Sequence, residues 1–157
     1  MTRTVDMEIV TALFDVSRAI SSSLELSEIL QRVMDLTTKV MRVEASSMVL
    51  LDEETGELIF YIAEGEMATK LKTFRMKSGE GVVGHVVQTK EAAIVNDVQQ
   101  DERFFKKVDV KTGFVTKSIL CVPLESTDRL WGAIEVINKL GDSNQGIPKQ
   151  CRIDHFF

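Results

Sequence analysis

The spacing of apolar residues separates a helical beginning of the chain from a later part made mainly of strands. Apolar residues recur three or four positions apart from about residue 4 to 21, which predicts an amphipathic helix. Three serines at 21–23 interrupt the pattern, and a second helix is predicted over about 26–42 with Ser27 as its N-cap. The apolar residues of the second helix form more than one stripe, so we expect it to pack on two sides. They are Ile29, Leu30, Val33, Met34, Leu36, Val40 and Met41.

Short segments with alternating or continuous apolar residues follow from residue 46 onward. The runs SSMVLLD (46–52) and ELIFYIAEG (57–65) predict two antiparallel strands joined by a hairpin turn at Glu54-Thr55-Gly56. Further strands are predicted at 73–76, 92–97, 118–126 and 129–139. We expect a helix at 82–89 (VVGHVVQT) and one or two helical turns at 99–107 (QQDERFFKK). This order predicts an α+β fold, with an antiparallel sheet covered by helices.

Length and composition favour one ordinary globular domain. The chain has 157 residues, of which 44% are hydrophobic and 27% charged, and this is enough apolar material for one core. We predict a single domain over residues 1–140. The segment 141–157 has no periodicity, and we interpret it as irregular or as foreign to the native chain.

The charge and the cysteine content exclude several classes of protein. A net charge of −5 argues against a nucleic-acid partner and against a basic helix on a membrane surface. No apolar run approaches the roughly 18 residues of a membrane span, and MTRTVDMEIV lacks the features of a signal peptide. Two isolated cysteines, Cys121 and Cys151, indicate a reduced compartment, so we expect a cytoplasmic protein.

The segment DVKTGFVT at 109–116 has two interpretations. Aspartate, threonine and glycine form turns, and Gly113 before a strand suits a positive φ. The hydroxyls of Thr112 and Thr116 can also donate and accept hydrogen bonds to a phosphate or a purine edge. Residue spacing alone leaves both interpretations open.

Other candidate chemistry along the chain is weak. The run GEGVVG at 79–84 has the spacing of a dinucleotide loop, but no βαβ unit surrounds it, so we interpret its glycines as turn formers near a cleft. His85 is interpreted as structural and Cys121 as a small core residue. Two histidines and two distant cysteines make a poor metal site. No catalytic motif is present, so we expect no enzyme activity and leave any cofactor unassigned.

The stretch from Gly79 to Leu124, GEGVVGHVVQTKEAAIVNDVQQDERFFKKVDVKTGFVTKSILCVPL, resembles the GAF domains, and LWGAIEVINK at 130–139 supports the same match. The likeness is greatest to the GAF domains of cyclic-nucleotide phosphodiesterases and adenylate cyclases, and it covers about residues 5–140. The resemblance implies a six-stranded antiparallel sheet with helices packed on one face and a ligand cleft on the other.

The resemblance also implies where a small ligand would bind. In cyclic-nucleotide binders of this family, matching positions line the pocket, and the polar ones keep their polar character here. Two features depart from the family pattern: Ala63 stands where an aromatic residue stacks on the purine, and Asn138-Lys139 lacks the downstream Phe and Asp-Glu. The implied ligand-binding residues are Ser47, Val82, Val83, Asp109, Thr112, Thr116 and Glu135.

These observations predict a regulatory sensor domain of a bacterial-type signalling protein. Its ligand is a small molecule, with a cyclic nucleotide as the candidate, and binding is transmitted to an output domain through terminal helices. One alternative is a ligand-free dimerisation or interaction module, and another is a methionine sulfoxide reductase that uses Cys121. The near-heptad stripe of the first helix either packs on the sheet of its own domain or joins a second copy of the chain. We predict a homodimer with an interface at Ile9, Leu13, Val16 and Ile20.

Overall fold

The computed structural model describes residues 23–66 and 68–141. The helix predicted over 4–21, its dimer stripe and the tail from 142 lie outside the described residues. The chain forms two compact units that divide between Val33 and Met34, and each unit is considered by itself. The division falls within the first described helix, α2, which spans Ser23–Met41. Ser27 therefore lies inside this helix, which corrects its assignment as the N-cap.

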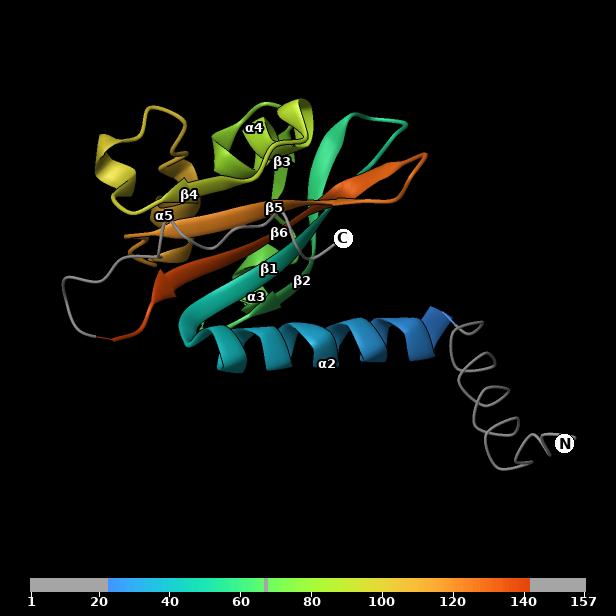
Figure 1. Cartoon of the computed structure of the whole chain (residues 1–157), viewed down its shortest axis with the longest axis horizontal. Helices are drawn as coiled ribbons and strands as arrows, with labels where there is room; N and C mark the ends of the chain where they lie inside the picture. Colours follow the sequence, from blue (N-terminus) through green and yellow to red (C-terminus); the bar gives the residue numbers. More distant parts are fainter. Residues whose placement is uncertain (1–22, 67, 142–157) are drawn as a thin grey trace, which may run out of the picture. The chain divides into compact units, whose positions relative to one another are not determined.

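Six strands form one antiparallel sheet in the order β3-β2-β1-β6-β5-β4 (Figure 1). The long central strands β1 and β6 pair along most of their length, and the hairpin predicted between 46 and 65 is confirmed as β1–β2. This is the six-stranded α+β fold that the sequence predicted. The strands are β1 (Val43–Leu51), β2 (Glu57–Glu64), β3 (Arg75–Lys77), β4 (Ala93–Val95), β5 (Ile119–Glu125) and β6 (Leu130–Lys139).

Short helices join the strands. α3 (Ala68–Leu71) precedes β3, and α4 (Gly81–Thr89) occupies the segment predicted as helical. The helical turns predicted at 99–107 are met only in part, because this stretch holds the end of a 3₁₀ turn, η1 (Val98–Gln100), and the first residue of the next helix. The next helix, α5, spans Lys107–Thr112, so DVKT is helical and not a simple turn. Gly113 ends α5 in the left-handed conformation with φ of 77°, a common helix C-terminus.

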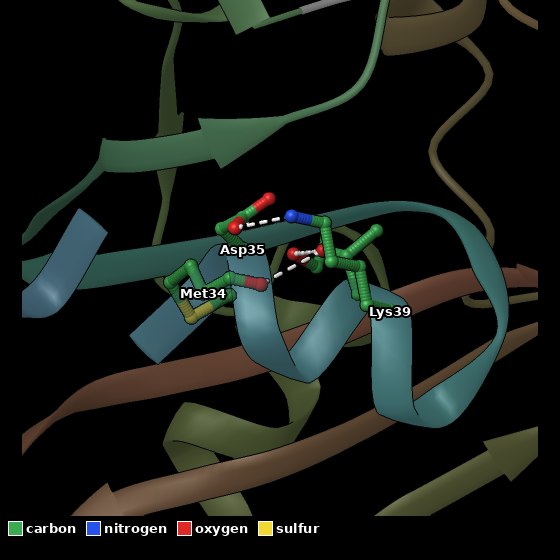
Figure 2. Close-up of polar contacts among 5 residues, drawn as sticks. Met34, Asp35 and Lys39 are labelled. Atoms are coloured by element: carbon green, nitrogen blue, oxygen red, sulfur yellow. Dashed lines mark hydrogen bonds and ion pairs between the residues drawn. The ribbon is translucent and has the colours of Figure 1, made fainter. Parts of the chain in front are cut away.

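Two neighbouring serines show that the two faces of the sheet have different roles. The Ser46 hydroxyl lies 2.6 Å from the Thr38 hydroxyl of α2, whereas the Ser47 hydroxyl donates to Glu135 of β6. Successive side chains of a strand point to opposite faces, so the end of α2 packs on the face opposite Glu135. An ion pair between Lys39 and Asp35 supports this last turn and a half of the helix (Figure 2).

The larger hydrophobic core lies on the Glu135 face. It is built around Val49, Leu58 and Val86, which are fully buried, and it includes side chains from β1, β2, β3, α4 and β5. A smaller cluster of Val43, Leu120 and Val136 packs with Met41 of α2. The larger core therefore supports the face on which a cleft can form.

β1 and β6 approach each other very closely at Gly132. A Cβ atom added there would lie 1.9 Å from the Val49 carbonyl oxygen, a distance that no real side chain shows. Glycine at this position therefore allows the two central strands to pair in register.

Candidate functional site

Two adjoining cavities lie on the Glu135 face of the sheet. Their volumes are about 50 and 30 Å³, enough for a few water molecules. They share part of their lining, which comes from β2, β6, α5 and the loop after it, and apolar groups predominate in both. The shared residues are Phe60, Val108, Asp109, Thr116, Glu135 and Ile137.

The sheet contributes a buried carboxyl group to this lining. Glu135 is only 7% exposed, and its Oε1 accepts a hydrogen bond of 2.7 Å from the Ser47 hydroxyl on the neighbouring strand β1. Burial raises the pKa of Glu135, and the hydrogen bond from Ser47 offsets this in part. The pairing of Ser47 with Glu135 in the β1–β6 register holds both side chains in place.

The opposite wall comes from α5 and the loop up to Thr116, which we call the lid (residues 107–116). Asp109 accepts two hydrogen bonds from Thr116, one from the backbone N–H at 2.8 Å and one from the hydroxyl at 2.6 Å. The two ends of the lid are thereby tied together. The Asp109 and Thr116 side chains both line the two cavities.

The N-terminus of α4 forms a third side of the larger cavity. Gly81, Val82 and Val83 line it, and the first N–H groups of an α-helix lack partners within the helix. Gly84 is required by the tight entry to α4, because a Cβ there would lie 2.8 Å from the Gly79 backbone, and Gly81 suits its positive φ of 71°. The GEGVVG run thus places the N-terminus of α4 beside the cavity.

The structure brings six of the seven predicted ligand residues to the cavities. Ser47, Val82, Val83, Asp109, Thr116 and Glu135 line one cavity or both, and Thr112 lines neither. The Thr112 hydroxyl instead donates to the Val108 carbonyl oxygen at 2.6 Å, as threonines within helices commonly do. This difference follows from DVKT being helical.

Several aromatic residues of the cavities were not singled out from the sequence. Phe60, Phe104 and Phe105 line the larger cavity, and Phe114 lines the smaller one. Ala63, the position that lacks the family's stacking ring, packs against the core and lines neither cavity. Its neighbour Glu64 lines the smaller cavity. The sequence shows two adjacent phenylalanines at 104–105 followed by two lysines, which could have marked these rings as candidates. Only the tertiary structure places them at the cavity.

Asn138 and Lys139 hold the end of β6 to its surroundings. The Asn138 side chain accepts hydrogen bonds from the backbone N–H groups of Lys117 and Ser118, and it donates to Glu44 and to the Val115 carbonyl. Lys139, which lacks the acidic partner of the family pattern, donates to the Met41 carbonyl at the end of α2. Asn138 therefore anchors the end of the lid and the two residues after it, and Lys139 anchors the end of α2.

Cys121 is unsuited to thiol chemistry in this structure. It is fully buried, and burial, together with the negative charge of its cross-strand partner Glu135, raises the pKa of its thiol well above the ordinary value. A raised pKa disfavours the nucleophilic thiolate. Across the described residues, no group of three or more His, Cys, Asp or Glu side chains is arranged to hold a metal ion.

Comparison with known proteins assigns the family. The family model described as "GAF domain" matches residues 25–150. The chain belongs to the GAF family. GAF domains are regulatory sensor domains of signalling proteins. In the parts that the structure describes, no helix is long and apolar enough to cross a membrane.

Two curated relatives are cyclic-nucleotide phosphodiesterases. A probable 3′,5′-cyclic phosphodiesterase of Caenorhabditis elegans is 28% identical over 137 residues, covering 81% of this chain and 19% of the relative. A dual 3′,5′-cyclic-AMP and -GMP phosphodiesterase of Takifugu rubripes is 28% identical over 135 residues, covering 74% of this chain and 15% of the relative. The chain therefore spans less than a fifth of the length of these relatives.

Among solved structures, the GAF domain of a phosphoenolpyruvate-protein phosphotransferase from Acinetobacter has a TM-score of 0.67 and 23% identity. The match covers 95% of this chain and 84% of that one. This similarity shows the fold.

Proposed function

We propose that this GAF domain is a small-molecule sensor whose ligand lies between the sheet and the lid, and that the ligand is a cyclic nucleotide. The observation that carries the proposal is the buried Ser47–Glu135 pair facing the lid residues Asp109 and Thr116. The Glu135 carboxyl and the Ser47 hydroxyl beside it can exchange hydrogen bonds with a purine edge.

In this proposal, the N-terminus of α4 lies next to the phosphate of the ligand. Backbone N–H groups at a helix N-terminus suit a phosphate, and Val82 and Val83 stand at this end of α4 beside the cavity. Phe60, Phe104 and Phe105 provide apolar faces for a flat ring in the absence of an aromatic residue at 63. The names of the two phosphodiesterase relatives are consistent with this ligand class.

Ligand binding would reach an output domain through the ends of this domain. Asn138 binds the exit of the lid, and Lys139 binds the last turn of α2, so a moved lid changes contacts next to that helix. Coupling between sites of this kind amounts to about 1–3 kcal/mol.

The direct test is titration calorimetry with cyclic AMP and with cyclic GMP. We expect saturable heat with one of them, and weaker binding in the Thr116→Val variant, which loses the hydroxyl beside the cavity. Gln99→Ala, on the exposed turn η1, is the matched surface control and should bind normally. An absence of heat and of thermal stabilisation at millimolar nucleotide would remove the nucleotide proposal.

A second candidate function, a dimerisation module, is favoured by one feature of α2. Leu36 and Val40 are 59% and 77% exposed, and Leu26, Ile29 and Val33 precede them with alternating spacings of three and four residues. This spacing is typical of a helix that packs against another helix. A second copy of the chain would cover this stripe with its own α2.

Mass measurement in solution tests the dimer. We expect twice the chain mass at micromolar concentration, and dissociation when Val40 is changed to lysine. The Lys39→Gln variant, on the adjacent position, is the control and should remain dimeric. A monomer at all concentrations would contradict this second function and leave the ligand proposal intact.

A further inference from the structure

Two lysine contacts join the lid to the segment that contains α3 and β3. Lys70 of α3 donates from Nζ to the Thr112 carbonyl oxygen at 2.7 Å. Lys111 of α5 places its ammonium 4.8 Å from the centre of the Phe74 ring, just before β3. One lysine thus reaches the lid from outside, and the other reaches outward from the lid.

The Lys70 contact meets a specific need of α5. The last carbonyl groups of an α-helix lack partners within the helix, and Thr112 is the last residue of α5. An ammonium group at this position satisfies the carbonyl and also matches the partial negative charge of the helix end. The Lys111 contact is a cation–π interaction with a ring that is itself 8% exposed and fixed in the core.

The two cavities are too small to hold a nucleotide, so binding requires part of their walls to move. Their volumes of about 50 and 30 Å³ are far below the roughly 300 Å³ of a small-molecule site. α5 has six residues, and a helix of this length is unstable in water without tertiary contacts. Loss of its contacts should therefore open the cleft and unravel the helix together.

We propose that Lys70 and Lys111 are positioning residues that hold the lid closed and set the rates at which ligand enters and leaves. The inference rests on the proposed sensor function and extends it to the control of access. Neither lysine lines the two cavities, so both act through the lid. Their contacts are present in the ligand-free protein, and the proposal requires them to form again when the lid closes over a bound ligand. Losing them should therefore speed entry and exit together and change the equilibrium affinity less.

Amide hydrogen exchange of the ligand-free protein tests this proposal. Three amides report on the lid: Val110, bonded to the Lys106 carbonyl; Gly113, bonded to the Asp109 carbonyl; and Thr116, bonded to the Asp109 carboxylate. We expect their exchange to become about tenfold faster in Lys70→Met, which loses a charged hydrogen bond. In Lys111→Met we expect exchange of the same amides to become about threefold faster, because a partly exposed cation–π contact contributes less than a charged hydrogen bond.

We call the contacts of Lys70 and Lys111 the latch, and Lys70→Met and Lys111→Met the latch variants. Matched controls separate the loss of the latch from general effects of losing a lysine. Lys72→Met, beside α3, and Lys106→Met, at the start of α5, remove the same charge without removing either contact, and they should leave the three amides unchanged. The β1 amides should exchange at the wild-type rate in all four variants. If the two latch variants exchange no faster than the controls, or if β1 amides accelerate equally, the proposal is overturned.

The experiment needs no ligand, so its outcome is independent of the nucleotide proposal. Faster lid exchange without any calorimetric response to cyclic nucleotides would support the latch and reject that ligand. A calorimetric response with unchanged lid exchange in the latch variants would support the sensor and reject the latch. Where a nucleotide does bind, stopped-flow measurements on the latch variants should show entry and exit accelerated by similar factors.

Discussion

The two walls of the cleft are held in very different ways. Ser47 and Glu135 lie on central strands that pair along β1 and β6, and they are 1% and 7% exposed. The lid exposes Val110 and Val115 by 83% and 66%, and a few contacts hold it in place. Under the proposed function, we expect the sheet to provide the fixed polar groups of the ligand site and the lid to be the part that opens.

Replacing one glycine in each wall by alanine should give the largest difference in stability between the two walls. Gly132→Ala should lower the free energy of unfolding by roughly 3 kcal/mol or more, because the new Cβ would lie 1.9 Å from the Val49 carbonyl oxygen. Gly113→Ala should cost only about 1–2 kcal/mol, since its φ is 77° but no atom lies within 4 Å of the new Cβ. Urea unfolding measures both. Equal losses of stability would show that the lid is as tightly packed as the sheet.

The carboxylate of Asp109 should have an intermediate effect that is confined to the lid. Asp109→Asn replaces the acceptor of two hydrogen bonds from Thr116, which should weaken lid closure by about 1–2 kcal/mol. Faster hydrogen exchange of the Thr116 amide would show that lid closure is weaker in this variant. Asp97→Asn is the matched control, because Asp97 accepts the backbone N–H of Gln99 and stands outside the lid. Equal effects on Thr116 exchange in both variants would contradict the role of Asp109.

Glu135→Gln should have the smallest effect on the free energy of unfolding at any single pH, but the effect should depend on pH. Its folded-state pKa is raised above the ordinary value of 4.5, so the folded state binds the proton more tightly than the unfolded state does. The wild type should therefore lose stability relative to Glu135→Gln as pH rises from 4.5 through the folded pKa. The loss should be about 1.4 kcal/mol for each pH unit that separates the folded and unfolded pKa values.

Unfolding of both proteins across this pH range measures the difference. Glutamine keeps an acceptor for the Ser47 hydroxyl, so packing is largely preserved. The exposed Glu125→Gln variant serves as the control and should follow the wild type. A constant difference between wild type and Glu135→Gln at every pH would show that the Glu135 carboxyl does not titrate differently on folding.

The same contrast explains what the sequence could predict. Short apolar runs predicted β1 and the final strands, and alternating apolar residues predicted β2, because strands of a sheet bury at least one of their faces. The cavity-lining positions on the sheet followed from the resemblance to GAF domains. α5 was not predicted, because KVDVKT has no apolar stripe and its stability comes from the Gly113 end and from the distant Lys70. Phe104 and Phe105 were missed for a related reason, since tertiary contacts alone bring them to the cavity.

The most direct measurement of the central claim compares amide exchange in the two walls with and without cyclic nucleotide. Without ligand, the amides of Val110, Gly113 and Thr116 should exchange at least about a hundredfold faster than those of Ser47 and Met48 in β1. Saturating cyclic AMP or cyclic GMP should slow the lid amides and leave the β1 amides unchanged. Lid amides that exchange as slowly as β1 in the free protein, and that respond to neither nucleotide, would contradict the account.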